Sequence, residues 1–288
     1  MYLQLLLIIF ITIFYLSHFG IPNDITKYLP EGEKPIKIVP VIRFMSKAET
    51  KAFILADKDK FISNLDPLNR IARGVKSNYE YLIITSKSGT DFTEKEKKSL
   101  TAAINLACDK LIKLKKRTLK HYGIDIIKLR ELLEKWKLAK TKNKVLEMGM
   151  PHTREDTIFL SSYYLANNID NIDKLTKTMI HEIIHIYQRT HSHDYIDFLK
   201  AHDWEIHPYN GNDKRLNPDL DELVWKRPVQ KGEVATKATR IEAGGYTIYI
   251  ALFNSRKPKD LKDINIKKAS LEHPYEYYAY KLSEEIMK

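Results

Sequence analysis

The sequence predicts an α+β protein in which one long helix and a small sheet form the last region of the chain. A mostly helical region and an N-terminal transmembrane helix precede it. The chain has 288 residues, 43% of them hydrophobic, which is enough for a sizeable core. It opens on an uncharged apolar run, continues with helical periodicity, and then changes to short apolar runs between turn residues. We therefore divide it into 1–22, 23–149 and 150–288.

The segment 1–22 is predicted to be a retained transmembrane anchor. Residues 1–23 carry no charged side chain, and the apolar run reaches about 20 residues, the length that crosses a bilayer as a helix. A cleaved signal peptide would have a basic start and a small-residue cleavage site, and the run has neither. Basic residues follow the run: Lys27, Lys34, Lys37 and Arg43. The positive-inside rule then places the rest of this single-pass protein on the cytosolic side.

The region 23–149 is expected to be mostly helical. A helical pattern covers Ser46–Phe61, whereas Tyr79–Thr85 fits a short strand. Thr93 and Glu96 form a capping box in front of a long amphipathic pattern, which predicts a helix that begins there. Another helix is predicted over Ile126–Leu138.

The region 150–288 is expected to alternate between strands and helices. A short strand, Asp156–Ser161, comes directly before a helix for which Asp173 can serve as the N-cap. Two further strands are predicted at Leu223–Trp225 and Tyr246–Phe253. The closing helix begins at Pro274, since proline is favoured in the first turn.

The long helix of this region carries the motif His-Glu-Ile-Ile-His at residues 181–185. Residues four apart on a helix lie on one face, so His181 and His185 can present two imidazole nitrogens to one metal ion. Glu182 lies beside the first ligand, where it can take a proton from a metal-bound water molecule. The spacing therefore predicts a metal site with an adjacent base.

A catalytic zinc site needs a third protein ligand, and three residues are candidates. Glu276 is favoured because it lies near the start of a helix whose apolar side faces the core. His191 occupies the third-ligand position of the pattern His-Glu-x-x-His-x-x-Gly-x-x-His, but Gln188 stands in place of the glycine that turns the chain. Glu205 is the third candidate, at a distance found in some short-spaced sites.

Two segments together resemble the zincin metallopeptidases, and most closely the gluzincin branch. They are His181–Gln188 and His273–Tyr280, whose second motif is similar to x-Pro-x-Glu-x-x-Ala. The overall pattern also resembles membrane-anchored zinc metallopeptidases of large DNA viruses, which would place the region in the cytosol or the virion interior. In the zincin family the edge strand before the motif helix pairs with the extended substrate, and the resemblance implies that this role falls to Asp156–Ser161.

The resemblance implies that region 150–288 is catalytic and hydrolyses peptide bonds in a protein or peptide substrate. Zn²⁺ would be held by His181, His185 and Glu276, and Glu182 would be the general base. A further donor should stabilise the tetrahedral oxyanion. The candidates for this donor are Tyr246, Tyr275, His207 and His273.

The charge of the chain supports an alternative from another class. The net charge is +11, but the lysines are scattered and no nucleic-acid recognition motif occurs, so a specific nucleic-acid partner is not expected. The alternative is a membrane-anchored basic interaction or structural protein with a non-catalytic metal site. The chain has one cysteine, Cys108, which excludes an intrachain disulfide and fits a reducing compartment.

Overall fold

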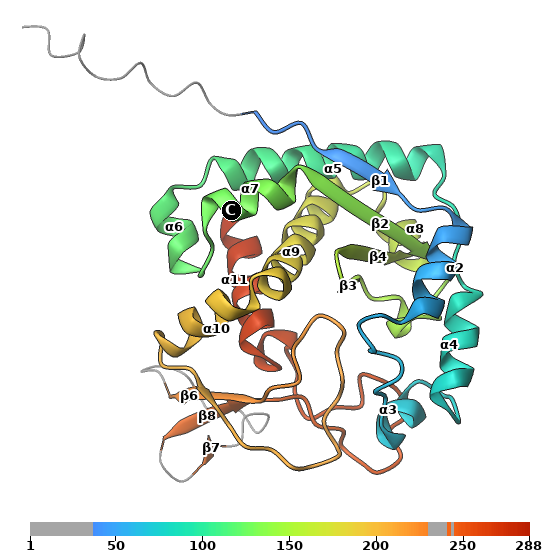
Figure 1. Ribbon diagram of the computed structural model, residues 1–288, viewed down its shortest axis with the longest axis vertical. Coiled ribbons are helices and arrows are strands. Elements are labelled where there is room, and N and C mark those ends of the chain that lie inside the picture. The colour runs from blue at the N-terminus through green and yellow to red at the C-terminus, as the bar shows by residue number, and fades with distance from the viewer. Residues whose placement is uncertain (1–36, 230–240, 243–244) are drawn as a thin grey trace, which may run out of the picture. The chain divides into compact units, whose positions relative to one another are not determined.

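The predicted transmembrane helix lies outside the part of the chain that the computed structural model describes, which is residues 37–229, 241–242 and 245–288 (Figure 1). Over these ranges, no helix combines the length and the apolar character that crossing a membrane requires. The α+β class is confirmed, with a mixed four-stranded sheet, a small antiparallel sheet and helices around both.

The larger sheet has the strand order β1-β2-β4-β3. Its strands are β1 (Val41–Phe44), β2 (Lys135–Thr141), β3 (His152–Arg154) and β4 (Thr157–Ser161). β1, β2 and β4 run parallel, and β3 returns antiparallel beside β4. The smaller sheet is antiparallel, with the order β5-β6-β8-β7, and lies below the larger one in Figure 1. Its strands are β5 (Glu205–Ile206), β6 (Trp225–Pro228), β7 (Ile241–Glu242) and β8 (Tyr246–Tyr249).

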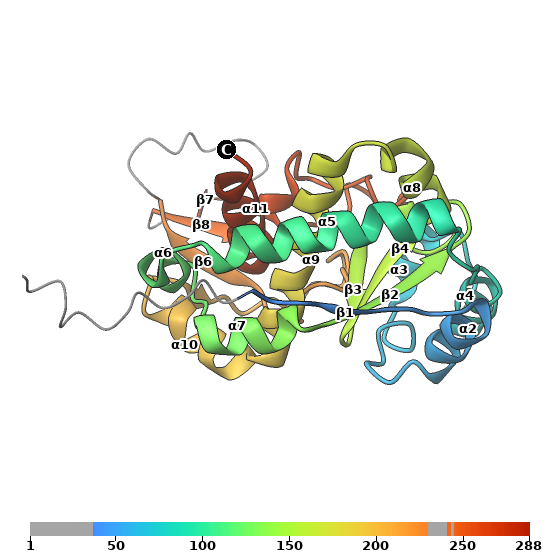
Figure 2. The same cartoon turned by 90° about the horizontal axis from the view of Figure 1, so that it is seen from above.

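Three long helices pack together beside the larger sheet (Figures 1 and 2). The central one is α9 (Ile172–Thr190), which packs against α5 (Glu94–Ile112) and α11 (Pro274–Ile286). The capping box of α5 is confirmed, because the Thr93 hydroxyl accepts from the Glu96 amide and Glu96 accepts from the Thr93 amide. The remaining helices are α2 (Lys47–Ala56), α3 (Pro67–Ala72), α4 (Asn78–Ser86), α6 (Lys116–His121), α7 (Ile126–Leu133), α8 (Ser162–Asn168) and α10 (Ser192–Lys200), with single 3₁₀ turns at Glu147–Gly149 and Ala269–Leu271.

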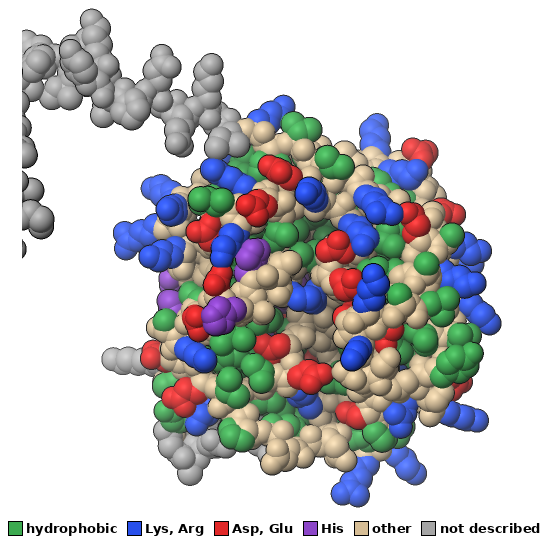
Figure 3. Space-filling model, viewed as in Figure 1, with side chains coloured by type: hydrophobic (Ala, Val, Ile, Leu, Met, Phe, Trp, Pro, Cys, Tyr) green, Lys and Arg blue, Asp and Glu red, His purple; other side chains and the backbone are tan. Residues whose placement is uncertain are grey.

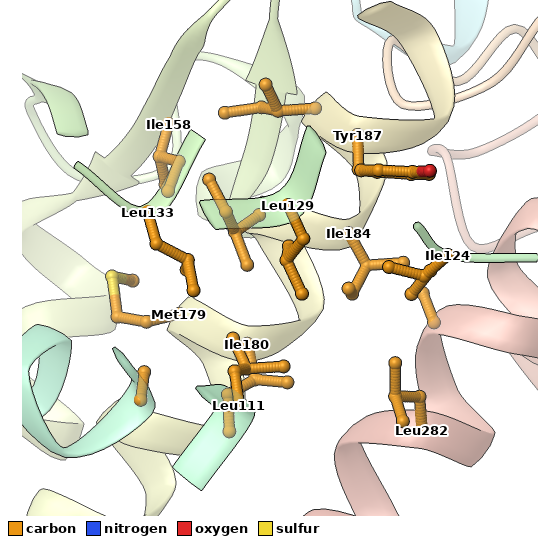
Figure 4. Close-up of a cluster of buried hydrophobic side chains, with 14 of the residues drawn as sticks. Leu111, Ile124, Leu129, Leu133, Ile158, Met179, Ile180, Ile184, Tyr187 and Leu282 are labelled. Carbon is orange, nitrogen blue, oxygen red and sulfur yellow. The ribbon is translucent and has the colours of Figure 1, made fainter. Parts of the chain in front are cut away.

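The main hydrophobic core lies between these helices and the larger sheet (Figure 4). It draws side chains from both sides of residue 150, and Ile38–Lys288 form one compact unit. Its fully buried members include Leu111, Leu129, Leu133, Ile158, Met179, Ile180 and Leu282. Truncating such a side chain to alanine typically lowers the free energy of unfolding by about 2–5 kcal/mol, so packing in this core stabilises the position of the motif helix.

Two predicted elements are wrong in type or extent. Tyr79–Thr85 is helical, because Ser77 caps α4 and the helix turns Tyr81 and Thr85 inward at a spacing of four. The helix predicted over Ile126–Leu138 ends at Leu133. The apolar residues beyond it alternate along β2, where the buried position between two parallel strands overrides helical periodicity.

Smaller corrections concern the ends of elements. Asn171, not Asp173, caps α9, and its Oδ1 accepts from the Lys174 amide at 3.0 Å. The helix predicted from Ser46 stops at Ala56 rather than Phe61, because Asp57 leaves helical geometry and accepts hydrogen bonds from the amides of the following turn. The late strands exist but are shifted, to Trp225–Pro228, or shortened, to Tyr246–Tyr249.

One correction concerns the strand to which the resemblance assigns pairing with a substrate. The strand expected at Asp156–Ser161 is β4, which lies between β2 and β3 and is paired on both sides. It is therefore not an edge strand, and β3 occupies the edge instead.

Lysine and arginine side chains are spread over the surface. On the face seen in Figure 3 they alternate with acidic side chains and do not gather into one patch. This distribution agrees with the scattered lysines of the sequence.

Candidate metal centre

Two neighbouring helices, α9 and α11, bring together His181, His185 and Glu276. The Nε2 atoms of His181 and His185 lie 3.0 Å apart. Oε2 of Glu276 lies 3.3 Å from Nε2 of His181 and 3.6 Å from Nε2 of His185. One ligand atom from each of the three lies within 4.8 Å of the other two, so this group can hold a metal ion.

The local sequence explains why each helix presents its ligand. On α9 the two histidines lie one turn apart, and the opposite face carries Met179 and Ile183 into the core. On α11 the ring of His273 caps the helix, and its Nδ1 accepts from the Tyr275 amide at 3.2 Å. Glu276 therefore lies in the first turn, where the helix dipole favours a carboxylate.

A buried amide orients His185. Gln188 donates through Nε2 to the Tyr195 hydroxyl at 3.0 Å and to the Tyr275 carbonyl at 3.1 Å. Since a carbonyl can only accept, the amide oxygen of Gln188 must face His185 Nδ1, 2.9 Å away. Nδ1 then carries the proton, and the Nε2 lone pair of His185 is left for a metal ion.

One of the two oxygens of the Glu276 carboxylate is fixed by a hydrogen bond, and the other is not. Its Oε1 accepts from the side-chain amide of Asn217 at 3.1 Å. Its Oε2, which faces the two imidazoles, has no hydrogen bond of good geometry in the described part of the chain. The arrangement thus fixes the carboxylate and leaves one buried oxygen for a cation.

The Glu276 carboxylate and the two imidazoles affect each other's protonation. Burial would raise the pKa of the Glu276 carboxyl, but the imidazoles of His185 and His181 hold that pKa well below its usual range. Burial would lower the pKa of the His185 imidazole, but the Glu276 carboxylate outweighs it and raises that pKa. Glu276 is therefore ionised and ready to compensate a positive charge.

Glu182 lies beside the group without being part of it. It is buried, and its Oε2 has no hydrogen-bond partner among the described residues. Burial raises its pKa well above the usual value, and the carboxylates of Asp219 and Glu276 add to the effect. A carboxylate with a raised pKa is suited to accept a proton near neutral pH.

His181 and Glu276 of the group line a cleft of about 420 Å³, together with Glu182; this volume is within the range of ligand sites. Two tyrosines line the same cleft, Tyr164 from α8 and Tyr280 from α11. The ring centroid of Tyr280 lies 4.4 Å from that of His181. Burial, with Glu276 and Glu182, raises the pKa of Tyr280, so its hydroxyl stays protonated and can donate.

The four candidates for an oxyanion donor are not found among the residues that line this cleft. Tyr246 instead donates to Glu205, and the ring of Tyr275 packs 5.2 Å from that of Tyr195. The structure brings Tyr280 to the group, which the sequence interpretation missed. Its signal was its position one turn after Glu276 on the same helix.

The other two ligand candidates are elsewhere. His191 ends α9, and its ring stacks on Tyr187 with the centroids 4.6 Å apart. Because Gln188 continues the helix where a glycine would have turned it, His191 is not returned to the motif. Glu205 is exposed on β5, with its carboxylate 3.5 Å from Lys226 Nζ. Neither belongs to the group formed by the described residues.

Fold and site together define an α+β protein with a buried His-His-Glu group that can hold a metal ion. Comparison of the chain with family models, with curated proteins and with solved structures gave no match.

Proposed function

We propose that the protein is a membrane-anchored zinc metallopeptidase with a zincin-like site of the gluzincin type. The observation that carries the proposal is the group of His181, His185 and Glu276, with Glu182 beside it, at a cleft that His181, Glu182 and Glu276 line. A structural metal site has no use for a buried, unpartnered carboxylate next to its first histidine. A hydrolytic site needs one as its base.

The donor set and its spacing suit zinc. Two imidazoles and one carboxylate are a common ligand set of catalytic zinc, with a fourth position for water. Bonds of the usual length place the ligand atoms of a tetrahedral zinc roughly 3.4 Å apart. The corresponding separations here are 3.0, 3.3 and 3.6 Å. Only small side-chain adjustments would be needed to admit the ion.

Each residue has a role in this proposal. When bound, zinc lowers the pKa of a water molecule and polarises the scissile carbonyl. Glu182 would accept a proton from the attacking water molecule, whose oxygen would form a bond with the carbonyl carbon. As the carbon–nitrogen bond breaks, Glu182 delivers the proton to the leaving amine. The hydroxyl of Tyr280 donates to the carbonyl oxygen as it gains negative charge.

The anchor and its orientation remain part of the proposal. The apolar run at residues 1–22 would hold the enzyme at a membrane, with residues 38–288 on the cytosolic side or inside a virion. Protease treatment of intact microsomes tests this placement. Digestion of the C-terminal region agrees with it, and protection of that region contradicts it.

Replacing Glu182 with glutamine tests the activity. Glu182→Gln keeps the shape of the side chain but cannot accept a proton at neutral pH. General base catalysis typically contributes about 10²–10⁴-fold, so hydrolysis of a peptide library should fall that far while zinc content stays unchanged. Glu205→Gln, the same exchange on the surface, should keep full activity. Indistinguishable cleavage profiles of wild type and Glu182→Gln would refute the proposal and favour the anchored interaction protein.

A further inference from the structure

The free edge of the larger sheet is closed beside the metal group. In β3 the residues at either end form the pairs His152–Phe159 and Arg154–Thr157 with β4. The peptide groups of Thr153, between them, point away from β4. Its amide donates to Oδ1 of Asp219 at 2.5 Å, and its carbonyl lies 3.5 Å from Nη2 of Arg189.

The segment that carries Asp219 is firmly held in place. Arg189 donates through the same Nη2 to the carbonyl of Pro218 at 2.7 Å, and Asn217 donates to Glu276. The Thr153 hydroxyl adds a second hydrogen bond to Oδ1 of Asp219 at 2.8 Å. The next outward-facing position along β3 is Pro151, which has no N–H. An extended chain therefore cannot pair along β3 beside the metal group, because the outward backbone groups of β3 already have partners or are missing.

His152 and Asp219 form a wall of the cleft beside the closed edge of β3, and this wall offers hydrogen-bond acceptors. His152 lines the cleft and is 3% exposed. Its Nδ1 lies 2.9 Å from the Met150 carbonyl, so Nδ1 carries the proton and Nε2 is an acceptor. This Nε2 is buried and has no donor among the described residues. Thr153 uses only Oδ1 of Asp219, and in the described ranges Oδ2 of Asp219 receives no protein hydrogen bond.

Arg189 interacts electrostatically with Asp219, but among the described residues it makes no hydrogen bond to the Asp219 carboxylate. Arg189 directs its N–H groups to the carbonyls of Glu155, Thr153 and Pro218 and to the Thr153 hydroxyl. Of the other basic residues that line the cleft, Lys174 and Lys177 come from the first turns of α9, before His181, and Arg215 is paired with Glu272. A buried acceptor without a donor is unfavourable by about 1–3 kcal/mol, so a ligand that supplies N–H groups would be stabilised here.

We propose that His152 and Asp219 receive the free α-amino group of the substrate, so that the enzyme removes residues from the amino end of peptides. This inference rests on the proposed peptidase function. The closed edge stops the chain, and the acceptors of the wall match an ammonium group at its end. Water is the co-substrate. Its oxygen forms a bond with the carbonyl carbon of a residue near the free amine, and the bond from that carbon to the next peptide nitrogen breaks.

The test compares two metal-directed probes on the full, zinc-loaded chain: leucine hydroxamate and its N-acetyl derivative. Isothermal titration should show the free amine binding about 10- to 100-fold more tightly, the value of one or two charge-assisted hydrogen bonds. Asp219→Asn keeps the acceptor for Thr153 but removes the charge, and His152→Phe keeps a ring to stack on Phe159. Each should reduce the preference at least several-fold, whereas Glu205→Gln should not.

The outcomes separate the two proposals. Equal affinity for the two probes, or tighter binding of the acetylated one, would overturn this inference and leave a zinc peptidase of another specificity. A preference that is the same in Asp219→Asn and His152→Phe as in wild type would overturn the assignment of the wall. If neither probe bound and no peptide were cleaved, the proposed function itself would fall, and this inference with it.

Discussion

Gln188 offers a quantitative test of how the site is organised. It is completely buried and bridges His185 Nδ1 to the Tyr195 hydroxyl and the Tyr275 carbonyl. Gln188→Leu, of similar volume, removes all three interactions. Loss of such an orienting partner typically weakens metal binding about 10- to 100-fold, or roughly 1.4–2.7 kcal/mol. The unpaired buried groups should also lower the free energy of unfolding by about 1–3 kcal/mol each.

A second exchange separates these two effects. Gln188→Glu keeps an acceptor for His185 Nδ1 but loses the donors to Tyr195 and Tyr275, so it should unfold more easily yet bind zinc at least as tightly as wild type. Competition with a chromophoric chelator measures zinc affinity, and urea denaturation of the metal-free chain measures stability. Zinc affinity like that of wild type in folded Gln188→Leu, or an equal loss of zinc affinity in the two variants, would show that Gln188 does not orient His185.

The remaining predictions concern the third ligand and a buried ion pair. Glu276→Ala should lose zinc on dialysis, measured by elemental analysis, whereas His191→Ala and Glu205→Ala should retain it; equal retention in all three would refute the ligand assignment. Glu147→Ala should lower the free energy of unfolding by about 3–5 kcal/mol in denaturant, because it leaves Arg73 buried without its partner. Burial opposes ionisation of Glu147, but Arg73 lowers its pKa below the usual value. The pair therefore stabilises the fold above the usual carboxyl pKa and loses this effect as the pH falls through the lowered value. Glu147→Gln should show a flatter dependence in acid, and an unchanged dependence would contradict the assignment.

Local signals were enough for much of the fold. The capping box at Thr93, the proline at the start of α11 and the apolar stripe of α9 each depend on residues within a few turns of each other. The errors arose where contacts with residues distant in the sequence determine the secondary structure. β2 follows its helix only because two parallel strands, β1 and β4, lie on either side of it. The sequence of residues 126–141 alone does not indicate that these two strands will flank it.

In the site, too, some features follow from local sequence and others from contacts between distant segments. The spacing of His181 and His185 predicts two ligands on one helix face, and the residue types around Glu276 select it as their partner. Tyr280 and the closed edge at Thr153 depend instead on how α11 and the segment around Asp219 pack across the cleft. Such packing is a tertiary property, so sequence spacing alone does not reveal it.

The coordination of the bound metal tests the central claim most directly. X-ray absorption at the zinc edge of the purified, zinc-loaded full chain reports the type and number of ligand atoms. The structure predicts close to one zinc per chain, bound by two imidazole nitrogens at about 2.0–2.1 Å, one carboxylate oxygen and one water oxygen. Glu276→Ala should change this spectrum, and Glu205→Ala should not. A chain that holds no zinc, or a site with three imidazoles or a sulfur ligand, would contradict the account.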